Sequence, residues 1–183
     1  KNFTRVIGLD SDQTASPELI FQSDGDITQF SEELRLNGST MNMKWVAGFY
    51  YLNIDTEYLQ GLAASPTGGY LAGEEQNTLA DITTDSYSVF GQIDYDLDDD
   101  LVLVAGLRLV QENKSLDGQL VQNANLDDRV IEVDDTATPL VDVALENDKF
   151  MWSAKLQLDY KPNEDTLLYA GVNRGVKAGN FNA

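Results

Sequence analysis

The sequence contains several segments of about ten residues in which apolar and polar side chains alternate with a period of two. In the clearest segment, 87–97, Val89 and Ile93 fall on one face while Ser88 and Gln92 fall on the other. This two-residue period is typical of β-strands, because successive side chains of a strand point to opposite faces of its sheet. The repeat of 3.6 residues that marks an amphipathic helix is nearly absent. The sequence therefore predicts an all-β fold of long strands.

The pattern predicts about seven such strands, and neighbouring segments fit together as hairpins. Around the turn Asp98-Asp99-Asp100, symmetric pairing sets Ile93 opposite Ala105, Val89 opposite Leu109 and Phe90 opposite Arg108, so both apolar faces lie on one side. In the last strand, Leu168, Ala170 and Val172 are assigned to the apolar face, although Leu167 is also apolar. The strands are expected at 2–9, 30–36, 43–52, 87–97, 101–111, 150–161 and 166–175.

The connections between these strands alternate in length. Short turns are expected at 37–42, 98–100 and 162–165, and long loops at 10–28, 53–86 and 111–149. Short turns on one rim and long loops on the other are typical of outer-membrane barrels, and a soluble sandwich has no reason for such regularity. We therefore predict an antiparallel up-and-down meander that is part of a large transmembrane β-barrel.

Charge follows the same division. The chain has 31 acidic and 12 basic residues, and its net charge is -19. The three long segments hold 21 of the acidic residues but only Lys114, Arg129 and Lys149 of the basic ones. We expect the acidity to lie in loops on one rim and not in the wall. Because a chain with this net charge repels phosphate groups, nucleic acid is not an expected partner.

Aromatic residues fall near both ends of the predicted strands, where a barrel meets the two membrane surfaces. Trp45, Tyr95 and Tyr160 lie near short turns, whereas Tyr51, Tyr87 and Trp152 lie near the other ends. An ordinary sandwich core with aromatic anchors is the alternative reading, and it would bury these positions in protein. The residues predicted to face lipid are Trp45, Phe49, Tyr51, Val89, Ile93, Tyr95, Leu101, Leu103, Leu107, Leu109, Trp152, Leu156, Leu158 and Tyr160.

Catalysis is not expected of this chain. It contains no histidine and no cysteine, so it has no imidazole base and no thiol nucleophile, and nothing in it indicates a cofactor. Paired carboxylates occur between residues 127 and 135, but in a hydrated loop with nothing apolar nearby to raise a pKa. Solvation is the favoured interpretation of this cluster, and binding of a hard cation such as Ca²⁺, bridging to lipopolysaccharide phosphates, is the alternative. The cation candidates are Asp127, Asp128, Glu132, Asp134 and Asp135.

Three residues are candidates for contact with a transported ligand. Arg108 is predicted to point into the lumen, with Phe90 and Gln92 across from it, where it could meet an anion. Tyr58 and Tyr70 lie in or near a glycine-rich stretch and could stack on a ligand. The alternative is that the tyrosines merely order a loop and that the lumen charges balance one another. In that interpretation Arg35, Arg108 and Lys155 neutralise Glu33, Asp94 and Asp159.

Several of these segments, taken in order, resemble the middle barrel of proteobacterial TonB-dependent receptors. The resemblance runs from Phe30 to nearly the end of the chain, and each piece alone is weak. Six in sequence, with matching turn and loop lengths, make a specific signal. The segments are Phe30-Ser-Glu-Glu-Leu-Arg-Leu36, Trp45-Val-Ala-Gly-Phe-Tyr-Tyr51, Tyr87-Ser-Val-Phe-Gly-Gln-Ile-Asp-Tyr95, Ala105-Gly-Leu-Arg108, Leu158-Asp-Tyr-Lys-Pro162 with Leu168-Tyr-Ala170, and Arg174-Gly-Val-Lys-Ala-Gly179.

This resemblance implies a barrel of roughly 22 strands, closed by a plug, in the bacterial outer membrane. Residues 1–183 would be a partial barrel without plug or closing strand, since about seven strands leave two edges open in lipid. The implied partners are outer-membrane lipid, lipopolysaccharide, TonB through the missing plug, and a small-molecule metal chelate. A ferric siderophore is the expected cargo. Vitamin B12, haem and oligosaccharides are alternatives, as are a passive porin-like channel and a soluble adhesive β-sandwich.

Overall fold

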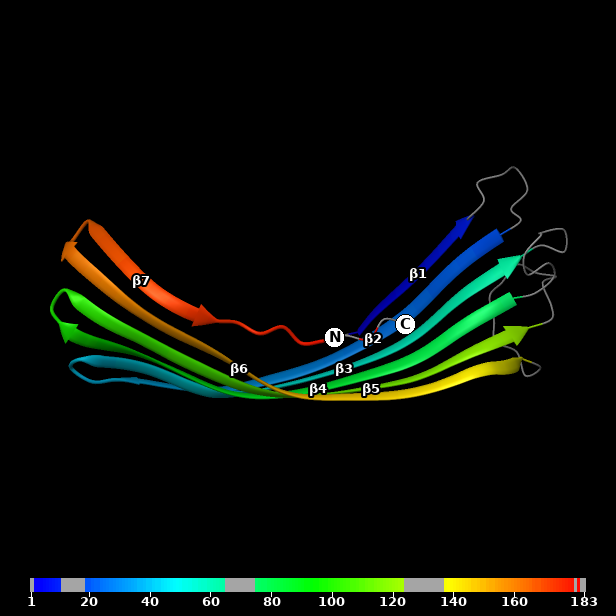
Figure 1. Ribbon diagram of the computed structural model, residues 1–183, viewed down its shortest axis with the longest axis horizontal. Helices are drawn as coiled ribbons and strands as arrows, with labels where there is room; N and C mark the ends of the chain where they lie inside the picture. The colour runs from blue at the N-terminus through cyan, green and yellow to red at the C-terminus, as the bar shows by residue number, and fades with distance from the viewer. Residues whose placement is uncertain (1, 11–18, 65–74, 124–136, 180, 182–183) are drawn as a thin grey trace.

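In a computed structural model, all seven strands of the chain belong to one sheet (Figure 1). The structure describes residues 2–10, 19–64, 75–123, 137–179 and 181. No helix in these ranges is able to cross a membrane. The strands are β1 (Asn2–Asp10), β2 (Leu19–Ser39), β3 (Met43–Ala64), β4 (Glu75–Asp98), β5 (Leu101–Asn123), β6 (Thr138–Asn163) and β7 (Thr166–Arg174).

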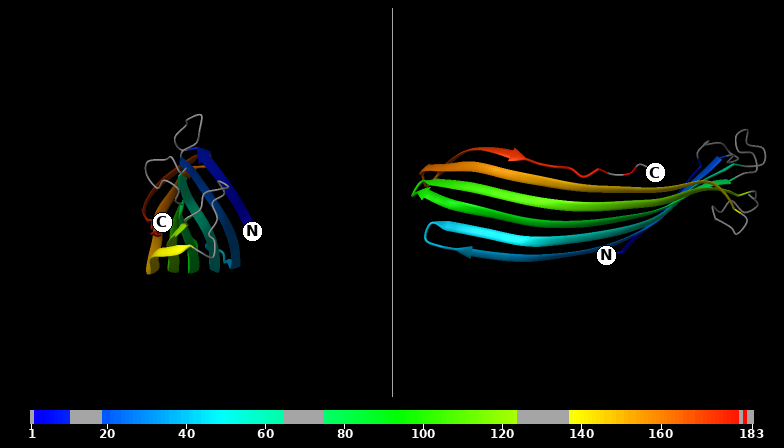
Figure 2. Two further views of the ribbon diagram at one scale, coloured as in Figure 1. Left: turned by 90° about the vertical axis from the view of Figure 1, so that its right-hand side faces the viewer. Right: turned by 60° about the horizontal axis from the view of Figure 1, so that its bottom comes forward.

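Each strand pairs antiparallel with its neighbours in the sequence, in the order β1 to β7. This arrangement confirms the predicted all-β antiparallel meander. The sheet is strongly curved both along and across its strands (Figures 1 and 2). The edge strands β1 and β7 lie at opposite ends of the long axis of the sheet (Figure 1). Because the described strands form one sheet with no second sheet against it, the sandwich alternative is wrong.

The predicted register of the central hairpin is confirmed. Ile93 pairs with Ala105, Val89 with Leu109 and Phe90 with Arg108. A register shift between Asp96 and Asp98 shortens the turn between β4 and β5. Asp98 pairs with Leu101, so only two residues form the turn.

The face assignment of β7 also agrees with its register. Leu168 pairs with Tyr160, and Ala170 pairs with Leu158. Val172 likewise pairs with Leu156 on the neighbouring strand. Since directly paired residues share a face of the sheet, the predicted apolar face of β7 continues that of β6.

The long loops predicted at 10–28, 53–86 and 111–149 are wrong for most of their length. These segments continue as strands, so that β2 to β6 are each 21 to 26 residues long. Within these segments the pairing of the described residues has one register shift, at Leu120 and Val121 in β5. The sheet therefore extends about twice as far from its short turns as the sequence pattern indicated.

Strands β2 to β6 each have two parts, which we call the near half and the far half, and β7 lies wholly in the near half. The near half lies next to the short turns and comprises 30–39, 43–52, 87–98, 101–111, 150–163 and 166–174. The far half comprises 19–29, 53–64, 75–86, 112–123 and 138–149.

Because the sheet is curved, it has a concave face and a convex face. Residues 175–179 run inside the hollow of the sheet (Figure 1), and there Lys114 Nζ donates to the Gly179 carbonyl over 2.7 Å, which places Lys114 on the concave face.

In the near half, the convex face is apolar. The register aligns the even residues of β2, β6 and β7 with the odd residues of β3, β4 and β5 on this face. Many of its aliphatic side chains are exposed, with Leu34 at 67% and Leu107 at 50%. In a protein surrounded by water so large an exposed apolar surface is rare, and it marks a contact with another apolar phase.

In the far half the polarity of the two faces is exchanged. The concave face now carries Ile27, Ile82, Leu116 and Leu145 in one row across β2 to β6, with Thr56 between them. Leu116 is only 5% exposed. The convex face carries most of the acidic side chains of the described far half, and Glu112 is the exception on the concave face. The convex acidic residues are Asp24, Asp26, Asp55, Glu57, Glu75, Asp81, Asp85, Asp117, Asp142, Glu146 and Asp148.

This arrangement corrects the prediction that the acidity belongs to loops and not to the wall. Most of the acidic residues assigned to loops 10–28, 53–86 and 111–149 lie on strands β1 to β6. The physical reason for the error is that the apolar residues of the far half alternate in the opposite phase, so the apolar stripe of the near half ends where the far half begins.

Candidate functional site

A row of residues on the concave face of the near half brings two arginines and a phenylalanine together. Arg35 in β2 pairs with Gly48 in β3, and Gly48 pairs with Phe90 in β4. Phe90 pairs with Arg108 in β5, which in turn pairs with Ser153 in β6. Paired residues lie at one level of the sheet, so these side chains form a band across five strands. Lys155 lies two residues from Ser153 on β6 and therefore on the same face, where it pairs with Gly106. We call Arg35, Phe90, Arg108 and Lys155 the lumen cluster.

Gly48 makes room for the ring at the centre of this band. A β-carbon on Gly48 would lie 2.5 Å from Phe90 Cζ and 2.8 Å from the carbonyl oxygen of Leu34, closer than real side chains approach. The Phe90 ring therefore lies across β3, toward Arg35. The absence of a side chain at one residue thus fixes the direction of its neighbour.

Both arginines lie beside the Phe90 ring. The guanidinium carbon of Arg35 is 5.9 Å from the ring centroid and that of Arg108 is 6.0 Å from it. Arg108 is also 5.6 Å from the centroid of Tyr50. At these separations the negative ring face attracts a cation, and a guanidinium can stack on the ring.

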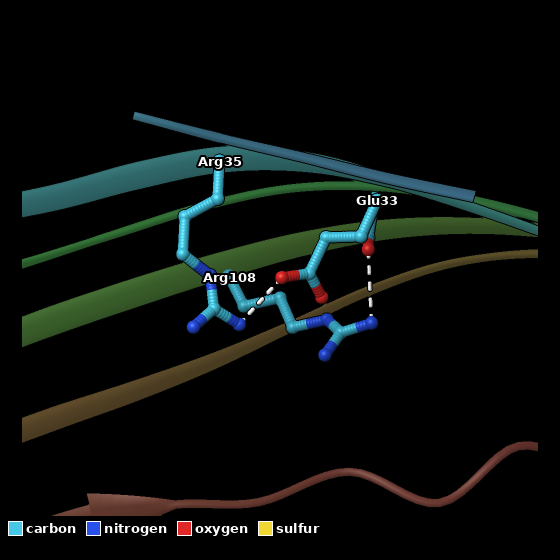
Figure 3. A network of polar contacts seen from close by, with 4 residues as sticks. Glu33, Arg35 and Arg108 are labelled. Atoms are coloured by element: carbon cyan, nitrogen blue, oxygen red, sulfur yellow. Dashed lines mark hydrogen bonds and ion pairs between the residues drawn. The ribbon is translucent and has the colours of Figure 1, made fainter. Parts of the chain in front are cut away.

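Polar contacts hold the two guanidinium groups from the strand side (Figure 3). Arg108 donates from Nη2 to Ser88 Oγ over 2.9 Å, and Ser88 is buried. Arg35 Nη2 lies 2.5 Å from Glu33 Oε1, although the Arg35 side chain remains 58% exposed. An exposed ion pair contributes little to stability, so Arg35 remains available to a ligand.

These side chains line a hollow of about 550 Å³ on the concave face. The charged side chains that the register places on this face are Arg35, Arg108, Lys155 and the single acid Glu33, and Arg174 at the edge of β7 also borders the hollow. Among the described residues, neither Arg108 nor Lys155 forms an ion pair with a carboxylate. The hollow is therefore positively charged within a chain whose net charge is -19.

The interpretation that lumen charges neutralise one another holds only for Arg35 and Glu33. Asp94 instead accepts a hydrogen bond from Gln92 at 3.0 Å, and Asp159 accepts one from Gln157 at 2.6 Å. In each of these pairs the donor and acceptor are two residues apart on one strand, because that spacing returns to the same face.

The remaining ligand and cation candidates are not part of this site. Tyr58 lies on the concave face of the far half, is half-buried, and donates its hydroxyl to Gln60 Oε1. Tyr70 and the acidic cluster lie outside the described residues. The cluster comprises Asp127, Asp128, Glu132, Asp134 and Asp135.

All the residues predicted to face lipid lie on the convex face of the near half by the register of their strands. At its far boundary, the rings of Tyr51 and Tyr87 are 5.0 Å apart, and the Tyr51 hydroxyl donates to Asp85 over 2.7 Å. At its turn boundary, the Tyr95 hydroxyl accepts a hydrogen bond from Asn42 at 3.0 Å. Aromatic residues thus lie at both margins of the apolar belt.

Sequence reasoning anticipated Arg108 and its position opposite Phe90, but it missed Gly48, Tyr50 and Ser88. These residues act by where they lie and not by a recognisable motif. The pairing register is the signal that could have found Gly48. It places Gly48 in the row of Arg35, Phe90 and Arg108, where it is the one position without a side chain.

Comparisons with known proteins agree with this architecture. A family model described as "TonB dependent receptor-like, beta-barrel" matches residues 2–183. The ferric yersiniabactin uptake receptor FyuA from Yersinia pestis is similar in structure, with a TM-score of 0.66, 17% identity, and coverage of 84% of this chain but 22% of that chain. The open form of the ferric-catecholate import receptor Fiu from E. coli K12 matches with a TM-score of 0.43 and 9% identity, over 94% of this chain and 34% of that chain.

The chain therefore spans less than a quarter of the length of FyuA, and its own fold agrees with that of the corresponding part. With the family model matching nearly the whole chain, we conclude that the chain belongs to the TonB-dependent receptor β-barrel family.

Proposed function

We propose that the chain forms part of the wall of a bacterial outer-membrane receptor that imports a ferric siderophore with energy supplied through TonB. The observation that carries the choice of cargo is the lumen cluster. Its cations line a hollow on the concave face, which is the lumen side of a barrel, in a chain that is otherwise strongly acidic. A positive site inside an acidic wall favours an anionic solute, and ferric chelates are commonly anionic.

In this proposal the near half spans the membrane and its convex face contacts lipid. From Tyr87 to Tyr95 the strand rises about 26 Å, which a barrel tilt reduces to about 20 Å. That height is close to the apolar band of about 25 Å found on outer-membrane barrels. The far half then stands outside the cell, where its acidic convex face meets water and lipopolysaccharide.

The proposal is tested by uptake in whole cells that express the full-length parent gene and lack other siderophore receptors. Ferric siderophores carrying radioactive iron are compared with labelled oligosaccharides, with and without an energised TonB system. We expect iron uptake that requires TonB. Uptake that is indifferent to TonB would identify a passive channel, and TonB-dependent uptake of an oligosaccharide alone would overturn the choice of cargo.

A further inference from the structure

We propose that residues 175–179, which we call the strap, alternate between two places: the lumen, where Lys114 holds Gly179, and the wall, where they continue β7 along β6. The inference rests on the part of the proposed function that sets the near half in the membrane, and not on the cargo. It is carried by the early end of β7, by the edge of β6 that this end leaves open, and by the contacts of Gly179.

Strand β7 ends half-way across the apolar belt. Its last residue, Arg174, pairs with Ala154, which in turn pairs with Leu107. Leu107 is four residues from Gln111, which pairs with Tyr87 at the far margin of the belt. Strands β2 to β6 all continue past that margin. Beside β6, the described sheet is therefore one strand short in the far portion of the belt.

The edge of β6 at residues 149–153 has no partner strand on its β7 side, among the residues that the structure describes. An unsatisfied backbone group is costly in an apolar phase, which is why membrane walls are closed ladders. Arg174 satisfies one such group, because its Nε donates to the Trp152 carbonyl oxygen over 3.4 Å. Its guanidinium carbon also lies 4.0 Å from the Trp152 ring centroid. The side chain thus bonds an acceptor that a continued strand would offer to a backbone N–H.

The strap has the residue pattern of a strand at this place. If the register of β6 and β7 continues, Val176 comes opposite Trp152. Two residues further, Ala178 comes opposite Phe150. Both would then lie on the convex apolar face, since paired residues share a face. Lys177 would face the lumen, so the continued strand sets its apolar residues toward lipid and its charge toward water.

In the structure the strap instead runs inside the hollow (Figure 1). Lys114 Nζ donates to the Gly179 carbonyl oxygen over 2.7 Å and lies 3.2 Å from Glu112 Oε1, with the Lys114 side chain only 11% exposed. A β-carbon on Gly179 would lie 3.2 Å from Lys149 Nζ and 3.5 Å from Asn147 Nδ2. Side chains of β5 and β6 therefore hold the end of the strap on the concave face.

Each place satisfies groups that the other does not. In the lumen, the Gly179 carbonyl is a second acceptor for Lys114 beside Glu112, while the edge of β6 stays open. In the wall, the strap completes the ladder of β6 and Lys114 keeps Glu112 alone. Two arrangements that exchange hydrogen bonds in this way form a two-state element. Movement into the wall also takes a segment out of the lumen, so closure of the wall widens the lumen.

The test measures disulfide formation in the full-length receptor, with any other cysteines replaced, in phospholipid vesicles. One cysteine pair reports the strap in the lumen, a second reports it in the wall, and a third joins residues that pair in β6 and β7 in both arrangements. Each pair is placed in a separate protein, and mass spectrometry gives its initial rate under mild oxidation. The pairs for the lumen, the wall and the control are Asn147→Cys with Gly179→Cys, Met151→Cys with Lys177→Cys, and Lys155→Cys with Asn173→Cys.

We expect all three pairs to form, and the lumen and wall pairs to form more slowly than the control because the strap divides its time between two places. Lys114→Met removes the donor, so it should slow the lumen pair by about threefold or more and speed the wall pair. Gly175→Thr leaves Lys114 intact and should also speed the wall pair. Threonine favours strands, and a β-carbon on Gly175 would meet nothing within 4 Å.

A lumen pair without a wall pair would fix the strap in the hollow, and a wall pair without a lumen pair would make it an ordinary part of β7. Either result would overturn the inference, and so would rates that Lys114→Met leaves unchanged. If the control pair forms slowly in Lys114→Met, that variant is misassembled and Gly175→Thr carries the test. TonB-dependent iron uptake with only one of the two pairs would overturn this inference alone. Both pairs in a receptor that moves no ferric chelate would overturn the choice of cargo and leave the strap standing.

Discussion

The near and far halves of the same strands present opposite chemistry on one continuous convex face. In the near half this face is a belt of exposed aliphatic and aromatic side chains, in which Glu32 and Arg174 are the charged residues. In the far half it carries acidic side chains, and the apolar residues move to the concave face. Both halves are antiparallel strands of one sheet, so the difference in polarity reflects what each half contacts.

The exchange occurs within a few residues of Tyr51 and Tyr87. In β3, the apolar positions are odd through Tyr51 and even from Leu52 onward, so the doublet Tyr51-Leu52 marks the change of phase. On the convex face, Tyr51 contacts its cross-strand partner Tyr87 and donates to Asp85, which lies further into the far half. A tyrosine with an apolar ring and a hydroxyl bonded to a carboxylate suits a boundary between an apolar phase and water.

A positive charge in the middle of the belt should have the largest effect. Leu107 lies midway between the two aromatic margins of the belt. It is four residues from Gln111, which pairs with Tyr87, and four residues from Leu103, which pairs with Tyr95. Leu107→Arg is expected to lower the free energy of unfolding by about 2–4 kcal/mol, because the charge would enter the apolar phase. Urea unfolding of the full-length protein in phospholipid vesicles measures this change.

Asp117→Arg is the matched control for that experiment, since residue 117 lies on the convex face of the same strand in the far half. It should cost nothing, because the new cation enters an acidic neighbourhood. Equal losses for the two variants would show that the two halves share one environment, and the comparison would then fail.

Truncation on the concave face should have the next largest effect, and it tests whether the far half has a packed interior. Leu116 is 5% exposed and lies in the row of Ile27, Ile82 and Leu145. Leu116→Ala is expected to lower local stability by about 2–3 kcal/mol, seen as faster amide hydrogen exchange in the far halves of β4 and β5. Leu145→Ala, at a position 46% exposed, should cost less than about 1 kcal/mol. Similar losses at both positions would contradict a packed interior.

The near half could be predicted from the sequence because its alternation is strong and constant in phase. Segments 87–97 and 101–111 gave both the strands and their register, which the pairing of Val89 with Leu109 confirms. The far half alternates as well, as in Ile54-Asp55-Thr56-Glu57-Tyr58, but in the opposite phase. A change of phase resembles the end of a strand, and a high density of polar residues resembles a loop, so the sequence predicts a loop where residues 53–64 and 75–86 form strands.

The lumen cluster could be predicted only in part. The face of the sheet on which Arg108 lies follows from the alternation of side chains along the strand. Its position opposite Phe90 follows from symmetric pairing about the turn, which the register confirms. The direction in which the Phe90 ring leans depends on Gly48 in another strand, and the pairing of β3 with β4 sets that relation across residues far apart in the sequence. Side-chain direction thus required the three-dimensional structure.

Adding a methyl group at Gly48 should have a smaller effect than a charge in the belt. A β-carbon there would meet Phe90 Cζ at 2.5 Å and the Leu34 carbonyl oxygen at 2.8 Å. Because the second of these is backbone, relief requires the strands to shift, and Gly48→Ala is expected to cost about 1–3 kcal/mol. Gly91→Ala, whose nearest atom is the Val46 carbonyl oxygen at 3.5 Å, should change stability by less than about 0.5 kcal/mol. Thermal unfolding compares the two variants, and equal stability would show that the Phe90 ring does not depend on Gly48.

The smallest expected effect comes from like charges in the far half. Asp26, Glu57, Asp81 and Asp117 are paired in one row across β2 to β5 on the convex face. Like charges directly opposite each other destabilise a sheet, so Asp81→Asn should raise stability by about 0.5 kcal/mol at roughly 0.01 M salt.

At about 1 M salt, where screening acts over about 3 Å, the gain from Asp81→Asn should vanish. Asp142→Asn is the control, because Asp142 accepts a hydrogen bond from Gln119 at 2.8 Å and lies outside the row. An asparagine oxygen can still accept this hydrogen bond, but the bond is weaker because the acceptor no longer carries a charge, so no gain is expected at low salt. Thermal unfolding in a salt series measures both variants. A gain for Asp81→Asn that persists at high salt would show that packing, and not charge, sets the stability of the far convex face.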